Sequence, residues 1–238
     1  MTINCKGELI DLSTPKVMGI LNITPDSFFD GGKFSSDSAV LKQVEKMLQE
    51  GATFIDVGAY SSRPNATHIS EAEELNRMQP ILELILKQFP DTLISLDTFR
   101  SEVAKKGIEL GASLINDISG GTMDKNMFKT IGSLKVPYVL MHIQGTPQTM
   151  QKEPAYKDVT SDVLYYFAKK VAALRAEKVN DIIIDLGFGF GKTMAHNYEL
   201  LKNMELFQQL ELPILTGVSR KSMLYKLLNS SPEEALNA

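Results

Sequence analysis

Short apolar runs alternate along the chain with longer stretches in which apolar residues recur every three or four positions. The short runs are typical of buried strands, and the periodic stretches are typical of amphipathic helices. Strands that are apolar throughout, rather than at every second position, indicate a parallel sheet covered by helices. The expected strands span residues 17–21, 53–57, 92–96, 113–115, 138–141, 182–184 and 214–215.

The helical pattern is clearest between the second and third of these strands. Ser70 and Glu73 have the spacing of a capping box, which predicts that this helix begins after Ser70. Pro80 is expected to kink or divide it, because proline donates no backbone hydrogen bond. Two further helices are expected, one with Thr160 as its N-cap and one that ends before Gly51. The apolar face of the helix that begins after Ser70 consists of Leu75, Met78, Leu82, Ile85 and Phe89.

Polar side chains able to do chemistry follow nearly every predicted strand. They come together only if the strand ends form a ring, whereas an open doubly wound sheet gathers only those beside one switch point. Asp and Asn also favour turns, so no single position is decisive, but the series favours the ring. We therefore expect residues 1–238 to form one α/β domain, a (β/α)8 TIM barrel. The polar residues at the strand ends are Asn22, Asp56, Asp97, Asn116, His142 and Asp185.

Composition narrows the function. With 43% hydrophobic and 23% charged residues among 238, the chain has enough apolar material for one substantial core. The net charge of -4 offers no overall attraction to nucleic acid or to an anionic membrane. Cys5 is the only cysteine, so no internal disulfide forms. No secretory signal or membrane-spanning stretch is recognisable, and we expect a cytoplasmic protein.

Two features suggest a flat ligand on the side of the strand ends. Connections at residues 23–36, 58–70 and 143–159 are longer than the usual length of about two to six residues, which favours a covering lid. The glycine-rich segment 187–193 is not a Walker loop, and Lys192 stands where a dinucleotide motif has its third glycine. Its glycines favour close approach of the backbone to a flat ligand, with an ordinary tight turn as the alternative.

Three hydrogen-bond acceptors, Asp97, Asn116 and Asp185, end the third, fourth and sixth strands. Because a buried carboxylate is costly unless paired, they favour a heterocycle with an edge of N–H donors, or else a divalent metal. His142 is either a catalytic base or a structural hydrogen-bonding residue. Cations near the same strand ends predict an anion site, unless they are simply solvated: Arg63, Lys192, Arg220 and Lys221.

Taken in order, seven segments resemble the signatures of the dihydropteroate synthase family. The resemblance extends over about residues 15–225 and implies a TIM barrel, usually a homodimer with Mg²⁺. It implies transfer of a pterinylmethyl group from dihydropterin pyrophosphate to p-aminobenzoate, with loss of pyrophosphate and without a protein nucleophile. The segments are residues 18–28, 61–64, 97, 115–118, 141–145, 185–192 and 219–222.

The resemblance also implies roles for single residues. Asn22 is expected at the metal and the pyrophosphate, and Asp97, Asn116, Asp185 and Lys221 are expected around the pterin. Asn22, Asp97, Asp185 and Lys221 are the catalytic residues in this interpretation. The substrate-binding residues, apart from Asn116, are Ser62, Arg63, Pro64, Met141, Phe190, Gly217 and Ser219.

The chain departs from the family in three places. It has Gly58-Ala59-Tyr60-Ser61-Ser62-Arg63-Pro64-Asn65 where Gly-Gly-Glu-Ser-Thr-Arg-Pro-Gly is common, and Leu186 where proline is usual. We also expect an eighth βα unit, with the Arg-x-His motif that the family carries there, to be absent from the chain. A barrel open between its first and seventh strands would lose an anion clamp, which predicts impaired turnover.

Three other functions stay open at this point. A pterin-binding methyltransferase that works with a cobalamin protein would share the barrel and the acceptor set, but its substrate carries no pyrophosphate. A non-catalytic pterin-binding paralogue would explain the altered second loop. A Schiff-base aldolase is disfavoured because Lys221 has no evident apolar setting in the sequence.

Overall fold

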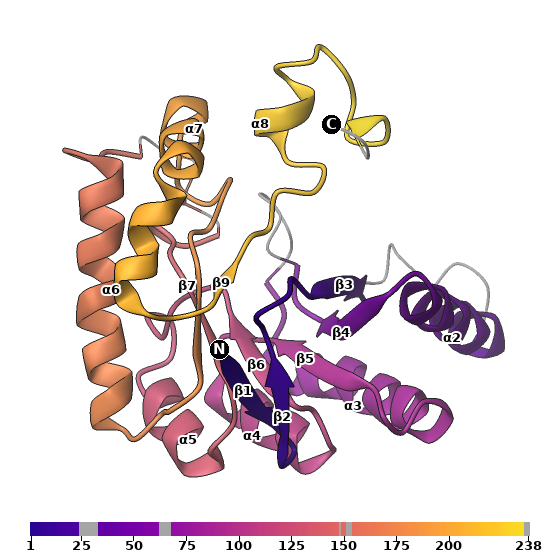
Figure 1. The fold of residues 1–238 in the computed structure, drawn as a ribbon. Coiled ribbons are helices and arrows are strands. Elements are labelled where there is room, and N and C mark those ends of the chain that lie inside the picture. Colours follow the sequence, from indigo (N-terminus) through magenta and orange to yellow (C-terminus); the bar gives the residue numbers. More distant parts are fainter. Residues whose placement is uncertain (24–32, 62–67, 148, 151–153, 236–238) are drawn as a thin grey trace.

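The computed structural model describes residues 1–23, 33–61, 68–147, 149–150 and 154–235. In this part of the chain a parallel sheet of seven strands runs in sequence order and curls, so that helices cover its outer surface (Figure 1). All seven expected strands are found. They are β3 (Val17–Asn22), β4 (Ala52–Gly58), β5 (Leu93–Asp97), β6 (Leu114–Asp117), β7 (Tyr138–Met141), β8 (Ile182–Asp185) and β9 (Ile214–Leu215).

A helix follows most of the strands, which confirms the predicted α/β alternation of a TIM barrel. Of the helices in the described ranges, none is long and apolar enough to cross a membrane. The helices are α2 (Lys33–Gln49), α3 (Glu71–Gln88), α4 (Ser101–Glu109), α5 (Met127–Leu134), α6 (Val159–Ala176), α7 (Met194–Lys202), η1 (Met204–Leu210) and α8 (Ser222–Tyr225).

Each strand presents alternate residues to the two sides of the sheet. In β4, Ile55 and Val57 belong to the main core between sheet and helices. Phe54 belongs instead to a second apolar cluster inside the curve, and Asp56 points to that same inner side because side chains repeat every two residues. This alternation places the polar ends of the strands inside the barrel and keeps the apolar residues under the helices.

The helix boundaries test the capping predictions. Helix α3 begins after Ser70, whose hydroxyl accepts from the backbone N–H of Glu73 at 3.1 Å. Of the two effects expected of Pro80, division of the helix is excluded, since α3 is continuous from Glu71 to Gln88 with Pro80 inside it. The predicted N-cap Thr160 is wrong, because Asp158 caps α6 by accepting from Ser161 N–H. The helix starts two residues earlier, where a carboxylate is available.

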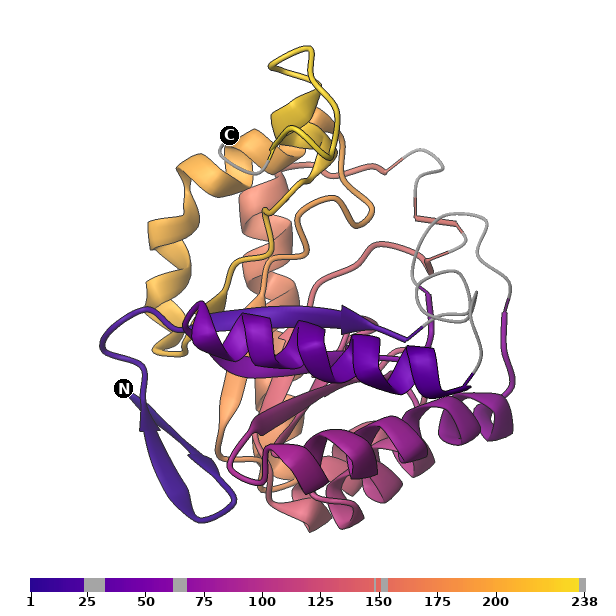
Figure 2. The ribbon, with the colours of Figure 1, turned by 90° about the vertical axis from the view of Figure 1, so that its right-hand side faces the viewer.

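The pattern did not predict the amino-terminal hairpin, which pairs β1 (Thr2–Cys5) with β2 (Glu8–Asp11) in antiparallel fashion. Ile3 and Cys5 are buried against Phe54 and Leu114, at the ends where β4 and β6 begin. The hairpin therefore lies at the amino-terminal end of the barrel, away from the strand ends that carry the acceptors (Figure 2).

Candidate active site

The strand register brings acceptors from separate strands into one row. Asn22 pairs with Gly58, Gly58 with Asp97, and Asp97 with Asn116, so the row crosses β3, β4, β5 and β6. Gly58 leaves space in the middle of this row: a Cβ there would lie 3.2 Å from Asp97 Oδ2 and 3.7 Å from Asn22 Oδ1. The two oxygens therefore flank the same gap.

Asp56 lies one pleat below this row and links it to the rest of the site. Its carboxylate accepts from Ser95 Oγ at 2.5 Å and from Asn116 Nδ2 at 3.1 Å. Burial raises the pKa of Asp56 to about 6; the two hydrogen bonds lower it, and the charge of Asp185 adds to the rise. The Asn116 amide nitrogen therefore donates to Asp56, and its side-chain oxygen has no hydrogen-bond partner among the described residues, so it can accept from a ligand.

Asp97 accepts no hydrogen bond from the described residues. Burial, followed by the negative charges of Asp56, Glu74 and Asp117, raises its pKa well above the usual range. A carboxylate held among like charges without a donor is expensive. Such a group is suited to a ligand that brings its own N–H donors.

Asp185 at the end of β8 and Lys221, the residue before α8, complete the polar set. Asp185 accepts from the backbone N–H of Gly187 at 2.8 Å. Burial raises its pKa, while that hydrogen bond and the ammonium groups of Lys221 and Lys192 act to lower it. Burial lowers the pKa of Lys221, and Asp185 opposes this. The Lys221 ammonium also lies 4.4 Å from the centre of the Phe190 ring, a cation–π arrangement.

An apolar wall lies beside these polar groups. Met141 and Ile118 form a buried cluster with Ile143 and Met150, and Phe190 packs against it. Met141 and Phe190 were expected here. Ile118, two residues after Asn116, was missed as a site residue because nothing in a single apolar residue distinguishes a ligand wall from an ordinary core.

The structure corrects the predicted set of cations. Lys192 does not face an anion site; its ammonium is buried against His142 Nδ1 at 2.9 Å and the carbonyl oxygens of Gly187, Phe190 and His142. Arg220 donates to the carbonyls of Pro232 and Glu233 at 3.2 and 3.4 Å. Only Lys221 among the described candidates stays directed at the acceptors. His142 Nδ1 is occupied by its contact with Lys192, which favours the structural of its two expected roles.

The other predicted site residues are either exposed or lie outside the described part of the chain. Gly217 and Ser219 are exposed in the segment between β9 and α8, and a Cβ on Gly217 would meet nothing within 4 Å. Asn22 is exposed at the end of β3. Three further predicted residues, Ser62, Arg63 and Pro64, lie outside the described residues. So do parts of all three connections that were expected to form a lid, namely residues 24–32, 62–67, 148 and 151–153.

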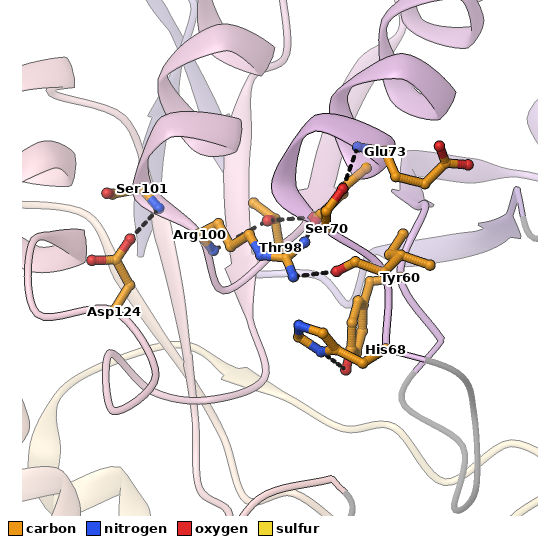
Figure 3. A network of polar contacts seen from close by, with 10 residues as sticks. Tyr60, His68, Ser70, Glu73, Thr98, Arg100, Ser101 and Asp124 are labelled. Carbon is orange, nitrogen blue, oxygen red and sulfur yellow. Dashed lines mark hydrogen bonds and ion pairs between the residues drawn. The ribbon is translucent and has the colours of Figure 1, made fainter.

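A network that the sequence did not reveal ties the connection after β4 to the one after β5 (Figure 3). The Arg100 guanidinium forms a buried ion pair with Glu74, donates to the Ile69 carbonyl at 2.6 Å and lies 5.5 Å from the Tyr60 ring. Tyr60 OH contacts His68 Nδ1 at 3.1 Å. Both described flanks of the second long loop are therefore held by a residue three positions after Asp97.

The described residues contain no group of three His, Cys, Asp or Glu side chains that could hold a metal ion. Among these residues there is therefore no set that would hold an ion mainly through carboxylates. Asn22 fits a different mode, in which Mg²⁺ takes one side-chain oxygen and completes its shell with substrate phosphates and water.

Comparisons with known proteins agree with this geometry. Residues 18–237 match the family model described as pterin binding enzyme. The dihydropteroate synthase of Haemophilus influenzae is 43% identical over 99% of this chain and 86% of its own length, and that of Escherichia coli is 42% identical over 100% and 84%. A crystal structure of Yersinia pestis dihydropteroate synthase with a sulfonamide drug complex matches 98% of this chain and 85% of its own, with a TM-score of 0.90 and 41% identity. A structure of the Xanthomonas albilineans dihydropteroate synthase in complex with 7,8-dihydropteroate matches 99% of this chain and 84% of its own, with a TM-score of 0.86 and 32% identity. The chain therefore belongs to the pterin binding enzyme family and, within it, to the dihydropteroate synthases.

Proposed function

We propose that this chain condenses 6-hydroxymethyl-7,8-dihydropterin pyrophosphate with p-aminobenzoate to form 7,8-dihydropteroate and pyrophosphate. The observation that carries the proposal is the convergence of Asp97, Asn116 and Asp185 from three strands beside the cation of Lys221. Membership of the dihydropteroate synthases supports the reaction, and the acceptor set explains how this chain would recognise the pterin.

The pterin ring offers an amino group and ring N–H groups along one edge. Asp97 and Asp185 can accept from these donors, and the free oxygen of Asn116 supplies a third acceptor. The ring faces would contact Met141 and Phe190, so that flat apolar surface meets flat apolar surface. A ligand with this edge also removes the cost of the unpaired carboxylate at Asp97.

At the methylene carbon the chemistry breaks one bond and forms one, and the attacking nitrogen gives up one proton to solvent or to the departing pyrophosphate. The methylene C–O bond of the pterin breaks, and pyrophosphate leaves with its electron pair. The anionic carboxylates stabilise the positive charge that develops on the pterinylmethyl group. The amino nitrogen of p-aminobenzoate then bonds to the methylene carbon and loses a proton. Positioning and electrostatics carry this reaction, so no protein nucleophile takes part in it.

Mg²⁺ is part of the proposal. When bound, it would neutralise charge on the departing pyrophosphate. Asn22 would offer its side-chain oxygen at the edge of the row, and Lys221 would add a positive charge from the other side. We place p-aminobenzoate and the pyrophosphate near Ser62, Arg63, Pro64, Gly217 and Ser219, as the family resemblance implies. A homodimeric assembly and a cytoplasmic location belong to the same proposal.

The test is release of pyrophosphate from the pterin substrate with Mg²⁺, with and without p-aminobenzoate. We expect release that depends on p-aminobenzoate and falls about 100-fold or more in Lys221→Met, while the control Lys226→Met on the exposed end of α8 keeps wild-type turnover. Pterin binding without any release would identify a non-catalytic binding protein. Methyl transfer to a cobalamin protein would identify the methyltransferase instead.

A further inference from the structure

The glycine-rich segment after β8 is fastened to the end of β7 by one buried side chain. Lys192 is 4% exposed, and its ammonium lies 3.0 Å from the Gly187 carbonyl oxygen, 3.1 Å from that of Phe190 and 3.2 Å from that of His142. The fourth neighbour, His142 Nδ1, lies at 2.9 Å. All three ammonium hydrogens therefore have acceptors on two different loops.

The charges around this group are consistent with a lysine ammonium beside a neutral imidazole. Burial and the nearby Lys192 lower the pKa of His142 to about 2, so its ring is neutral and Nδ1 can accept. Burial lowers the pKa of Lys192 to about 7, Lys221 adds to this, and Asp185 opposes it. The surrounding carbonyl oxygens favour the charged form, because each accepts a charge-assisted hydrogen bond.

The glycine-rich segment and the end of β7 are packed too closely to admit a side chain between them. A Cβ on Gly187, where φ is +65°, would lie 2.0 Å from the His142 carbonyl oxygen. Tyr156 OH donates to the Gly191 carbonyl at 2.7 Å and holds the far end of the segment. Phe190, between these anchors, packs against the Met141 cluster and lies under the Lys221 ammonium.

We infer that Lys192 is a positioning residue of the pterin site, which ties the loop carrying Phe190 to the strand end carrying Met141 and so sets the apolar wall and, through Phe190, the place of Lys221. The inference rests on the proposed function for the identity of the ligand. In this inference Lys192 would not touch either substrate and would act through the carbonyl groups of Gly187 and Phe190 that it binds.

The experiment compares Lys192→Met, which keeps length but removes every donor, with Lys192→Gln, which keeps two N–H donors. Lys202→Met is the matched control, because Lys202 is exposed on the neighbouring α7. Equilibrium binding of the dihydropterin pyrophosphate is measured by pterin fluorescence without p-aminobenzoate, and hydrogen exchange is followed at the amides of residues 187–191. Neither readout requires turnover, so a failure of the proposed reaction would be seen separately, as absent pyrophosphate release in the wild type.

In Lys192→Met we expect the pterin affinity to fall about tenfold or more, with faster exchange at Phe190 and an unchanged KM for p-aminobenzoate at saturating pterin. Lys192→Gln should lie between this variant and the wild type in both readouts. A folded Lys192→Met with wild-type pterin affinity would overturn the inference, as would a lowered melting temperature without loss of affinity. If neither variant folds, Lys192 serves the stability of the barrel and the inference is wrong.

Discussion

At the residue scale, the buried carboxyl groups of this site suit ligand binding but lower the stability of the free protein. Asp56, Asp97 and Asp185 all have a raised pKa, with burial as the first cause. An acid whose folded pKa exceeds its unfolded pKa stabilises the folded state at low pH, and this contribution is lost as the pH rises through the folded value. The free protein therefore has these carboxylates at a cost near neutral pH, and a ligand with N–H donors offsets that cost.

We predict that Asp97→Asn stabilises the free protein and weakens pterin binding. At pH 7.5 the free energy of unfolding should rise by about 1 kcal/mol or more, because the variant removes a carboxylate that the fold disfavours when charged. The gain should shrink as the pH falls toward 4, because the folded acid is then protonated and the unfolded acid, with its ordinary pKa of 3.8, is becoming so. Calorimetric melting at both pH values and pterin fluorescence titration measure the two effects, and pterin affinity should fall about 100-fold.

Asp124 is the matched control for the sign of this effect. Burial acts to raise the pKa of Asp124, but hydrogen bonds from Ser101 and Asn126 outweigh this and lower it. Asp124→Asn should therefore destabilise the protein, by more at pH 7.5 than at pH 4. Parallel behaviour of the two variants would contradict the electrostatic explanation.

At the scale of elements, the connections that follow the strands depend on buried ion pairing. Arg100 joins the flanks of the loop after β4 to the start of α4, and its partner Glu74 is 1% exposed. We predict that Arg100→Met lowers the free energy of unfolding by about 3 kcal/mol, because it leaves Glu74 buried without its cation. Urea denaturation measures the loss.

The double variant Glu74→Gln/Arg100→Met should lose less free energy of unfolding than the two single variants added together, because each single change leaves the other residue buried without its partner. The exposed pair Lys46–Glu50, 3.8 Å apart, provides the contrast. Lys46→Met should change stability by less than about 0.5 kcal/mol. Additive losses at Arg100 and Glu74 would show that the pair does not act as a unit.

At the scale of the whole molecule, the amino-terminal hairpin covers the end of the barrel where the strands begin. The opposite end, where the strands finish and the acceptors lie, stays available for the ligand. Ile3 is 1% exposed against residues from several strands, whereas Leu9 on the same hairpin is 71% exposed. We predict that Ile3→Ala costs about 2–4 kcal/mol of stability and that Leu9→Ala costs less than about 0.5 kcal/mol. Equal urea midpoints for the two variants would show that the hairpin is not part of the core.

The sequence by itself determined the order of strands and helices and the polar residues that end each strand. These features follow from periodicity within short segments, because alternation of two or three-to-four residues is a property of the local backbone. The candidates Asp97, Asn116 and Asp185 were found in this way, since a strand end in a parallel barrel faces the ligand wherever it occurs. The family motifs then supplied a ligand whose donor edge suits them.

Only the tertiary structure decided which charged groups face that ligand and which are used internally. Lys192 and Lys221 are alike as sequence signals, yet one is buried among carbonyl oxygens and the other lies beside Asp185. The pairing of Arg100 with Glu74 and the burial of Ile3 against Phe54 likewise join segments far apart in the chain. No local pattern encodes such contacts, because the free energy of a charge or an apolar side chain depends on the partners that folding brings to it.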